Sequence, residues 1–341
     1  TGIITKVRGR GAFRRRIMEM GFVKGKQITV VKNAPLKDPI EYNIMGYEVS
    51  LRRSEASLID VITKEEAKQE YSEDFKGTIT DNQLKQTASK KQKEINIALV
   101  GNPNSGKTTL FNFASKSRER VGNYSGVTVD SKIAKYKQKG YTFNITDLPG
   151  TYSLSAYSPE ELYVRKHILG ELPDIVINVV DASNLERNLY LTTQLIDMDI
   201  KVIIALNMYD ELQNKGDYFD YESLGKMIGV PIVPTISSKG KGIKELFNKT
   251  IEVFEDKDPT VRHIHINYGK CVENSIKNIQ DEIWKNKRLT DIVSSRFYAI
   301  KLLEKDSAAS FTLSNWNNYQ AIKEIAEKEI QKVESHYSED S

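Results

Sequence analysis

Hydrophobic and polar residues follow several patterns along the chain, and the first predicts a small β domain. In residues 1–62, short apolar runs alternate with turns rich in glycine and proline. The expected strands are Gly2–Val7, Gln27–Lys32, Ile40–Met45 and Glu48–Leu51, with one helical segment at Ala12–Met20. Several short strands around so small a core predict a barrel of the SH3-like kind.

Residues 63–94 have a different pattern, polar and charge-rich with only scattered apolar side chains. A segment of this composition does not bury a core of its own. We therefore expect a polar linker that is in part helical.

From residue 95 to residue 257, apolar runs alternate with amphipathic stretches, which is typical of βαβ units. The expected strands are 95–100, Ile133–Lys137, Thr142–Asp147, Ile175–Asp181, Lys201–Asn207 and Pro231–Pro234. The expected helices are Glu160–Leu169, Leu185–Met198, Tyr221–Ile228 and Ile243–Phe254. This alternation predicts an α/β domain with a mainly parallel, doubly wound sheet.

The last part of the chain, residues 258–341, reads as amphipathic helices and predicts a separate helical bundle. Before the first of these helices, the alternation in 261–267 predicts one edge strand, which would place His263 and His265 on one face. Together with Cys271 these histidines are a weak candidate for a metal site. We expect Cys271 instead to be a small residue at the start of a helix.

The strongest candidate chemistry lies where the apolar run 95–100 ends. Gly101-x-x-x-x-Gly106-Lys107-Thr108 is the pattern of a phosphate-binding loop between a strand and a helix. Its amides form an anion-binding concavity, Lys107 reaches the outer phosphates, and the Thr108 hydroxyl is placed to ligate Mg2+. The residues expected to contact nucleotide here are Gly101, Asn102, Asn104, Ser105, Gly106, Lys107, Thr108 and Thr109.

A second motif, Asp147-Leu148-Pro149-Gly150, ends an apolar strand one βαβ step after the phosphate loop. There Asp147 can hold Mg2+ through water, and the Gly150 amide can meet a γ-phosphate. Thr128 is the only threonine between Ala114 and Lys139, so it is the candidate residue for covering Mg2+ and the γ-phosphate.

The base-recognition candidates follow the next two predicted strands. Asn207-Met208-Tyr209-Asp210 lies at the carboxyl edge of the sheet, where ligands bind in open α/β folds. The Asp210 carboxylate can accept both N1–H and the exocyclic amine of guanine, which favours GTP over ATP. We expect the turn after the next predicted strand to close over the base with Ser237, Ser238 and Lys239.

Composition excludes several classes of protein. The chain has 341 residues, is 39% hydrophobic and 28% charged, and contains no apolar run near the 18 residues of a membrane span. We expect no signal peptide. Its one cysteine excludes an internal disulfide. The net charge of +4 is too small to argue for nucleic acid. Residues 1–62 are nonetheless basic, with twelve Lys and Arg against six Asp and Glu.

Two families resemble parts of this chain. The stretch RGRGAFRRRIMEMGFVKGKQITVVKNAPLKDPIEYNIMGYEVSLRRSEA resembles FeoA, a small SH3-like protein of bacterial ferrous-iron uptake. The stretches VGNPNSGKTTLFN, VGNYSGVTVD, DLPGTYSLS, NMYDE and SRFYAIKLLEKD resemble FeoB, the GTP-dependent ferrous-iron transporter. The second resemblance covers residues 95 to 341, including a GDI-like helical domain, but not the membrane-embedded permease.

The FeoB resemblance implies binding of GTP and GDP, with Mg2+ held by Thr108, Thr128 and Asp147. It also implies that Asn104 lets the GTPase use K+ as an activating ion, and that switch regions lie near 117–131 and 151–165. The implied partner is the FeoB membrane domain, at the cytoplasmic side of the bacterial inner membrane. An FeoA–G domain contact and a homo-oligomer are further expectations, and nucleic acid is not expected.

Two features of the sequence predict slow hydrolysis and loose nucleotide binding. No glutamine occurs in 151–165 to orient an attacking water, and Met208 stands where many GTPases place a lysine beside the base. The residues expected to carry catalysis are Lys107, Thr128, Gly150 and Asn104.

The sequence leaves two alternatives open. The chain can be a nucleotide-gated binding module in which hydrolysis only resets a switch. It can also be a ribosome- or RNA-associated GTPase whose basic barrel grips RNA, since the run Arg14-Arg15-Arg16 is either a phosphate contact or a solvated helix face.

Overall fold

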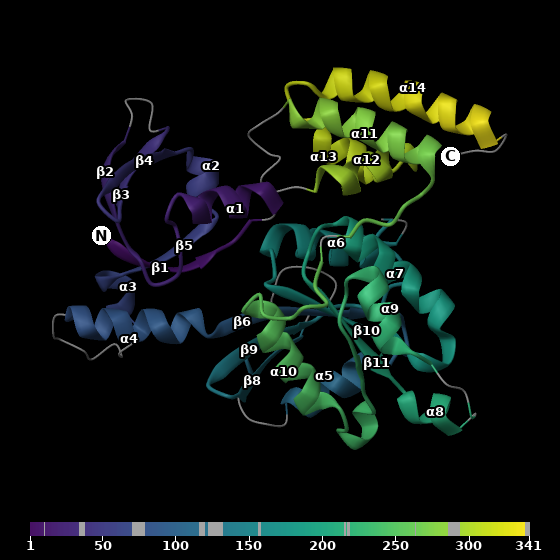
Figure 1. Cartoon of the computed structure of the whole chain (residues 1–341), viewed down its shortest axis with the longest axis horizontal. Coiled ribbons are helices and arrows are strands. Elements are labelled where there is room, and N and C mark those ends of the chain that lie inside the picture. The colour runs from purple at the N-terminus through teal and green to yellow at the C-terminus, as the bar shows by residue number, and fades with distance from the viewer. Residues whose placement is uncertain are drawn as a thin grey trace. The chain divides into compact units, whose positions relative to one another are not determined.

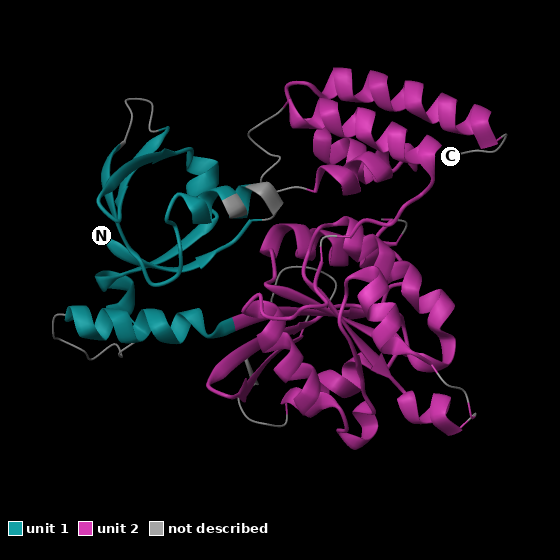
Figure 2. Ribbon diagram, viewed as in Figure 1, with its two compact units in different colours: residues 1–94 teal, residues 95–341 magenta. Residues whose placement is uncertain are grey.

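The structure is a computed structural model that describes residues 1–9, 11–33, 38–69, 79–115, 120–121, 132–155, 158–214, 216, 219–262, 264–285 and 294–337. The chain divides into two compact units, residues 1–94 and residues 95–341, which Figure 2 shows in different colours. Each unit is organised around its own sheet (Figure 1).

Unit 1 is built on a five-stranded antiparallel sheet with the strand order β4-β3-β2-β1-β5. Its first elements are β1 (Gly2–Val7), α1 (Gly11–Glu19), β2 (Gln27–Asn33), β3 (Ile40–Ile44), β4 (Tyr47–Leu51), α2 (Arg53–Ala56) and β5 (Ile59–Thr63). The sheet curls around a core that is at most 1% exposed, formed by Ile4, Ile17, Phe22, Ile44 and Leu51. The predicted small β domain is confirmed. Strand β5 was not predicted, because its apolar run passes directly into a charged segment.

The segment after β5 packs more closely than its composition suggested. It forms α3 (Lys64–Gln69) and α4 (Asp81–Gln92), and α4 begins with a capping box in which Thr80 and Gln83 each satisfy the other's backbone amide. Leu84 and Ala88 are one helical turn apart and are buried in a cluster with Ile3, Ile62, Ala67 and Ile79. The expectation that this segment buries no core is corrected, since two apolar side chains at i and i+4 suffice to dock a helix on a sheet.

Unit 2 has a seven-stranded sheet with the order β12-β11-β10-β6-β9-β8-β7. The strands are β6 (Glu94–Gly101), β7 (Arg120–Val121), β8 (Lys132–Gln138), β9 (Tyr141–Asp147), β10 (Ile175–Asp181), β11 (Val202–Asn207) and β12 (Ile232–Pro234). The strands β6, β10, β11 and β12 pair in parallel, whereas β8 pairs antiparallel with β7 and β9. The predicted mainly parallel sheet is confirmed, with an antiparallel edge.

Helices cover both faces of this sheet (Figure 1). They are α5 (Lys107–Ser115), α6 (Pro159–Glu171), α7 (Leu185–Asp197), α8 (Tyr209–Asn214), α9 (Tyr221–Ile228) and α10 (Ile243–Phe254), with 3-10 turns at Ala182–Asn184 and Ser237–Lys239. Strand β10 shows the alternation: Val176 and Val180 pack with α6 and α7, whereas Ile177 and Val179 pack with α5 and α10. A strand buried on both faces therefore reads as a nearly continuous apolar run, which in β10 is interrupted by Asn178.

The C-terminal helices are α11 (Lys270–Trp284), α12 (Ser295–Leu303), α13 (Ser307–Leu313) and α14 (Tyr319–Tyr337). The predicted helical part is confirmed, and its apolar side chains join the same cluster as those of α6 and α7. The predicted edge strand at 261–267 is wrong for the residues that the structure describes there, which form no strand. They form an irregular connection, in which the Arg262 amide donates to the Gly229 carbonyl at 3.3 Å. Cys271 lies in the first turn of α11, as expected.

Within the described residues, no helix is both long enough and apolar enough to cross a bilayer. The same part of the chain contains no group of three or more His, Cys, Asp or Glu side chains that could hold a metal ion.

Candidate nucleotide-binding site

The phosphate-loop residues connect the end of β6 to the start of α5. The turn needs glycine at Gly106, where φ is +85° and a Cβ would lie 2.1 Å from the Asn207 Nδ2 atom. Asn104 also has a positive φ, 67°, and its side chain is exposed, as are those of Thr108 and Thr109 in the first turn of α5. The loop therefore has the tight, amide-rich shape that the sequence predicted.

Lys107 and Asp147, predicted to serve phosphates and Mg2+, lie side by side. The Lys107 ammonium forms an ion pair with the Asp147 carboxylate at the end of β9, and the two residues are 8% and 7% exposed. The structure thus brings the phosphate loop and the Asp147-x-x-Gly150 motif into one site. A buried lysine beside a buried carboxylate gives this site charges of both signs.

Gly150 sits directly against the phosphate loop. A Cβ at Gly150 would lie 3.1 Å from both the backbone nitrogen and Cα of Pro103, tighter than an ordinary contact. The next residue, Thr151, donates its amide to the Gly101 carbonyl at 3.1 Å. The backbone that directly follows Gly150 is therefore held by the loop that is expected to bind phosphate.

Asn207 links the two sides of the predicted nucleotide site. Its Nδ2 atom donates to the Ser105 carbonyl at 2.9 Å, and its Oδ1 atom accepts from the amide and the hydroxyl of Ser237 at 2.9 and 2.8 Å. The residue is 2% exposed. Because its two carboxamide atoms bond to these two segments, Asn207 acts as a brace between the phosphate loop and the Ser237–Lys239 turn.

Asp210 and Lys239, both expected to contact the base, face each other. The Lys239 ammonium donates to Asp210 Oδ2 at 2.7 Å, and this hydrogen bond holds the pKa of Asp210 below its ordinary value. Asp210 is therefore a charged acceptor at neutral pH. Met208 adopts a positive φ of 56° between Asn207 and the start of α8.

Two buried oxygens of the phosphate loop, Asn102 Oδ1 and Ser105 Oγ, have no hydrogen-bond partner in the described part of the chain. Asn102 and Ser105 are only 4% and 1% exposed. Buried polar atoms without a partner are rare and require an explanation such as a bound polar group. Thr128 and most of the expected switch region 117–131 lie outside the described residues.

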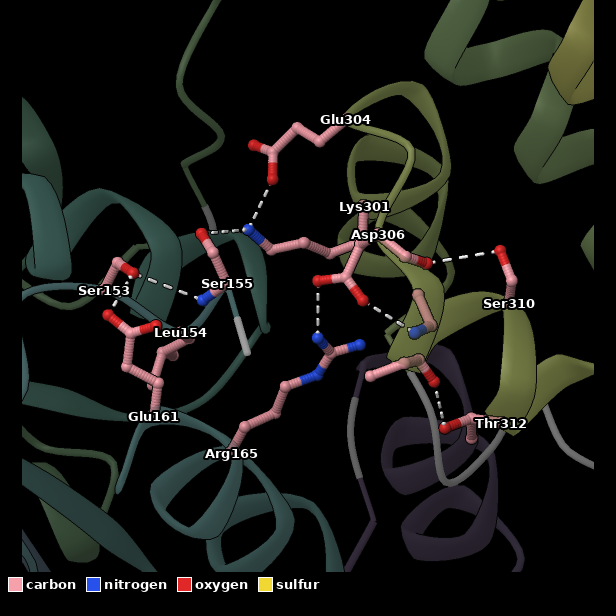
Figure 3. A network of polar contacts seen from close by, with 12 residues as sticks. Ser153, Leu154, Ser155, Glu161, Arg165, Lys301, Glu304, Asp306, Ser310 and Thr312 are labelled. Atoms are coloured by element: carbon pink, nitrogen blue, oxygen red, sulfur yellow. Dashed lines mark hydrogen bonds and ion pairs between the residues drawn. The ribbon is translucent and has the colours of Figure 1, made fainter. Parts of the chain in front are cut away.

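Sequence reasoning missed the contacts that the segment after Gly150 makes with the C-terminal helices (Figure 3). The Lys301 ammonium of α12 is 1% exposed and lies 3.2 Å from the Ser155 hydroxyl and 2.6 Å from Glu304. Below it, Arg165 of α6 pairs with Asp306 at 2.8 Å. For Lys301 the signal was a charged residue inside an apolar run, between Ile300 and Leu302, whereas Arg165 stands next to Lys166 and had no such signal.

A second polar joint lies at the end of α7. The Asp197 carboxylate accepts from the Tyr268 hydroxyl at 2.6 Å and from Arg296 Nε at 3.0 Å, and Arg296 also pairs with Glu273. Burial and the Asp197 carboxylate raise the pKa of Tyr268 far above its ordinary value. The α12 helix is therefore held to the α/β part of unit 2 at both of its ends.

The sheet order, the loop between β6 and α5, and the motifs at the ends of β9 and β11 together define a P-loop GTPase fold. Family models match in three places: "Ferrous iron transport protein B" at residues 95–250, the FeoA domain at 1–63, and the FeoB cytosolic helical domain at 268–341. The chain belongs to the FeoB family and carries an FeoA domain in the same polypeptide.

Among curated proteins, the chain is 46% identical over 327 residues to an Fe(2+) transport protein A/Fe(2+) transporter FeoB fusion protein of Porphyromonas gingivalis. That match covers 89% of this chain and 39% of the relative. An Fe(2+) transporter FeoB of Staphylococcus aureus is 37% identical over 240 residues, which are 70% of this chain and 35% of the relative. The chain thus spans less than half the length of either relative.

Solved structures of NFeoB from S. thermophilus are similar over the FeoB part. One, bound to GDP.AlF4- and K+, is 40% identical with a TM-score of 0.60, and the match covers 72% of this chain and 92% of that one. Another, bound to mGMPPNP, is 41% identical with a TM-score of 0.59, over 72% and 89% of the two chains.

Proposed function

We propose that this chain binds GTP and hydrolyses it slowly, as the G-protein part of a ferrous-iron transporter. The observation that carries the proposal is the convergence of three motifs on one edge of the sheet. Lys107 contacts Asp147, Gly150 lies against Pro103, and Asn207 joins the phosphate loop to the Ser237–Lys239 turn. Guanine-nucleotide complexes of the S. thermophilus relatives support the same assignment.

Different residues of the site bind different parts of the nucleotide. The Lys107 ammonium supplies positive charge to the outer phosphates, and the loop amides add hydrogen bonds at the N-terminus of α5. The Gly150 amide is a donor for a γ-phosphate oxygen because no side chain separates it from the loop. The ionised Asp210 carboxylate accepts the paired donors of guanine, which adenine lacks.

Oxygen donors suited to Mg2+ lie beside Lys107, namely the Asp147 carboxylate and the exposed Thr108 hydroxyl. We place Mg2+ on these two residues, with Thr128 as a third. The ion supplies neutralisation of phosphate charge when it is bound.

Asn104 fits a K+ site. Its side chain is exposed on the phosphate loop, where the backbone has a positive φ of 67°. The amide oxygen of this side chain is a suitable ligand for a large monovalent cation. A bound K+ supplies positive charge near the scissile bond.

Slow hydrolysis follows from the absence of glutamine in 151–165 and from Met208 beside the base.

The transporter role rests on the named relatives, whose remaining length this chain does not span. We propose that the chain works at the cytoplasmic side of the inner membrane, with the FeoB membrane domain as its partner. The FeoA domain is proposed to regulate the G domain, and a homo-oligomer is a further proposal. In liposomes that hold the full-length protein, Lys107→Ala should abolish GTP-dependent uptake of Fe2+.

A direct test of GTP binding is titration of the full chain with a fluorescent GTP analogue. Lys107→Ala removes the ammonium that faces the phosphates and should weaken binding about 10²-fold. The matched control is Lys323→Ala, which removes an exposed lysine from α14, far along the chain from the site. Equal affinities of wild type and Lys107→Ala would refute the assignment.

A further inference from the structure

The segment Thr151–Ser155, which directly follows Gly150, is held by hydrogen bonds along its length. Thr151 donates its amide to Gly101 in the phosphate loop, and its hydroxyl donates to the Ser153 carbonyl at 2.6 Å. The Ser153 hydroxyl lies 2.7 Å from Glu161 of α6 (Figure 3). The segment is thus a short ordered strap rather than a free loop.

Helix α7 supplies the other contacts of this strap. Gln194, which is 7% exposed, accepts the Leu154 amide at Oε1 over 2.6 Å and reaches the Ser155 hydroxyl with Nε2 at 3.4 Å. The Arg187 guanidinium lies over the Tyr152 ring, 4.0 Å from its centroid. Arg187 and Gln194 are seven residues apart and lie on one face of the helix.

The first turn of α7 also touches the phosphate loop. Asn102 Nδ2 donates to the Arg187 carbonyl at 3.4 Å, and Asn102 is itself buried. The same helical turn therefore contacts the loop through its backbone and the strap through its side chain. A shift of either part relative to α7 breaks one of these contacts.

We infer that Arg187 and Gln194 are positioning residues for recognition of the γ-phosphate. They hold the strap, and the strap sets where the Gly150 amide stands relative to the phosphate loop. This inference rests on the proposed binding of GTP. Because GDP lacks the γ-phosphate, loosening the strap should weaken binding of GTP analogues and leave binding of GDP nearly unchanged.

Gln194 provides the first test in the full chain. Gln194→Met keeps the size of the side chain but leaves the buried Leu154 amide without its acceptor, whereas Gln194→Glu keeps an acceptor. Titration with fluorescent GDP and with a fluorescent, non-hydrolysable GTP analogue gives the affinity ratio of the two nucleotides. We expect the ratio of the affinity for the GTP analogue to the affinity for GDP to fall about five- to tenfold in Gln194→Met. In Gln194→Glu this ratio should lie close to that of the wild type. Gln320→Met, on the exposed side of α14, is the matched control.

Arg187 provides an independent test through a double-mutant cycle. Arg187→Met should lower the same ratio about two- to fivefold, and Arg187→Lys should restore most of it. The effect of Arg187→Met should vanish in a Tyr152→Leu background, because the ring that it covers is gone.

Each result separates this inference from the proposed function. If the wild type binds no guanine nucleotide, the proposed function itself fails. If the wild type binds both nucleotides but the variants keep its affinity ratio, or lose both affinities equally, Arg187 and Gln194 have only a structural role and the inference is wrong. If Gln194→Met does not fold, the Gln194→Glu and Arg187 variants decide.

Discussion

Replacing Asp306 measures how strongly α12 and α13 are held to the α/β part of unit 2. Asp306 Oδ2 accepts from Arg165 Nη1 at 2.8 Å, and the side chains are 4% and 3% exposed. Removing one partner of a buried pair costs about 3–5 kcal/mol, since the other charge stays buried. The Arg165 Nη2 atom has no partner in the described part of the chain, so the pair has one hydrogen bond and we expect the lower figure.

The second oxygen of Asp306 separates two contributions. Oδ1 caps α13 by accepting the Ala309 amide at 2.7 Å. Asparagine caps a helix about as well as aspartate, whereas alanine loses the cap at a cost of about 1 kcal/mol. We therefore expect Asp306→Asn to lower the free energy of unfolding by about 3 kcal/mol and Asp306→Ala by about 4 kcal/mol.

Urea unfolding of the full chain, followed by tryptophan fluorescence, measures both losses. The chain has two tryptophans, Trp284 and Trp316, and both lie among the C-terminal helices. Glu327→Gln removes one partner of an exposed pair on α14 and should cost less than about 0.5 kcal/mol. A loss below about 1 kcal/mol for Asp306→Asn would refute the reasoning. The reasoning would also be refuted if the double variant Arg165→Met/Asp306→Asn lost an unfolding free energy equal to the sum of the losses in the two single variants.

Three further predictions concern the base, the ion and the second joint. Asp210→Asn should lower the preference for GTP over ATP by about 10²-fold in competition binding, because an amide leaves the donors of guanine mismatched. Phosphate release from GTP should be faster in K+ than in Na+ at equal ionic strength, and Asn104→Ala should abolish the difference; equal rates in the wild type would exclude the ion. The hydrogen bond from Arg296 lowers the pKa of Glu273 in the folded protein. The Glu273–Arg296 pair therefore stabilises the fold fully at a pH above the ordinary glutamate pKa of about 4.3, and this stabilisation is lost as the pH falls through the lower pKa of the folded protein. The difference in unfolding free energy between wild type and Glu273→Gln should thus shrink in acid, and a constant difference would contradict this.

Much of unit 2 was predictable because its signals are local in the sequence. Strand β10 is an apolar run interrupted only by Asn178 before its final Asp181, and the predicted bounds of α9 and α10 match the structure. The phosphate loop is marked by the spacing of its own residues, although the contact that requires glycine at Gly106 is with the distant Asn207 at the end of β11. Such patterns point to a candidate site from the sequence alone.

Contacts between distant segments were not predictable in the same way. Gln194 lies 40 residues after the Leu154 amide that it binds, and nothing in its neighbourhood marks it as different from any helical glutamine. Arg187 likewise reads as an ordinary exposed residue until its helix is placed beside Tyr152. Lys301 did carry a signal, since a charged residue between two apolar ones on a helix predicts a buried partner.

The packing of α4 has a consequence for how the FeoA domain can be exchanged between proteins. Leu84 and Ala88 cover Ile3 and Ile62, which belong to the strands of the curled sheet. A fragment that ends at Thr63, where the match to the FeoA domain ends, would leave this apolar surface open to water. The smallest part of unit 1 that can be transferred with its core covered is therefore the sheet together with helix α4. A fusion that separates the sheet from α4 should expose the apolar surface and aggregate.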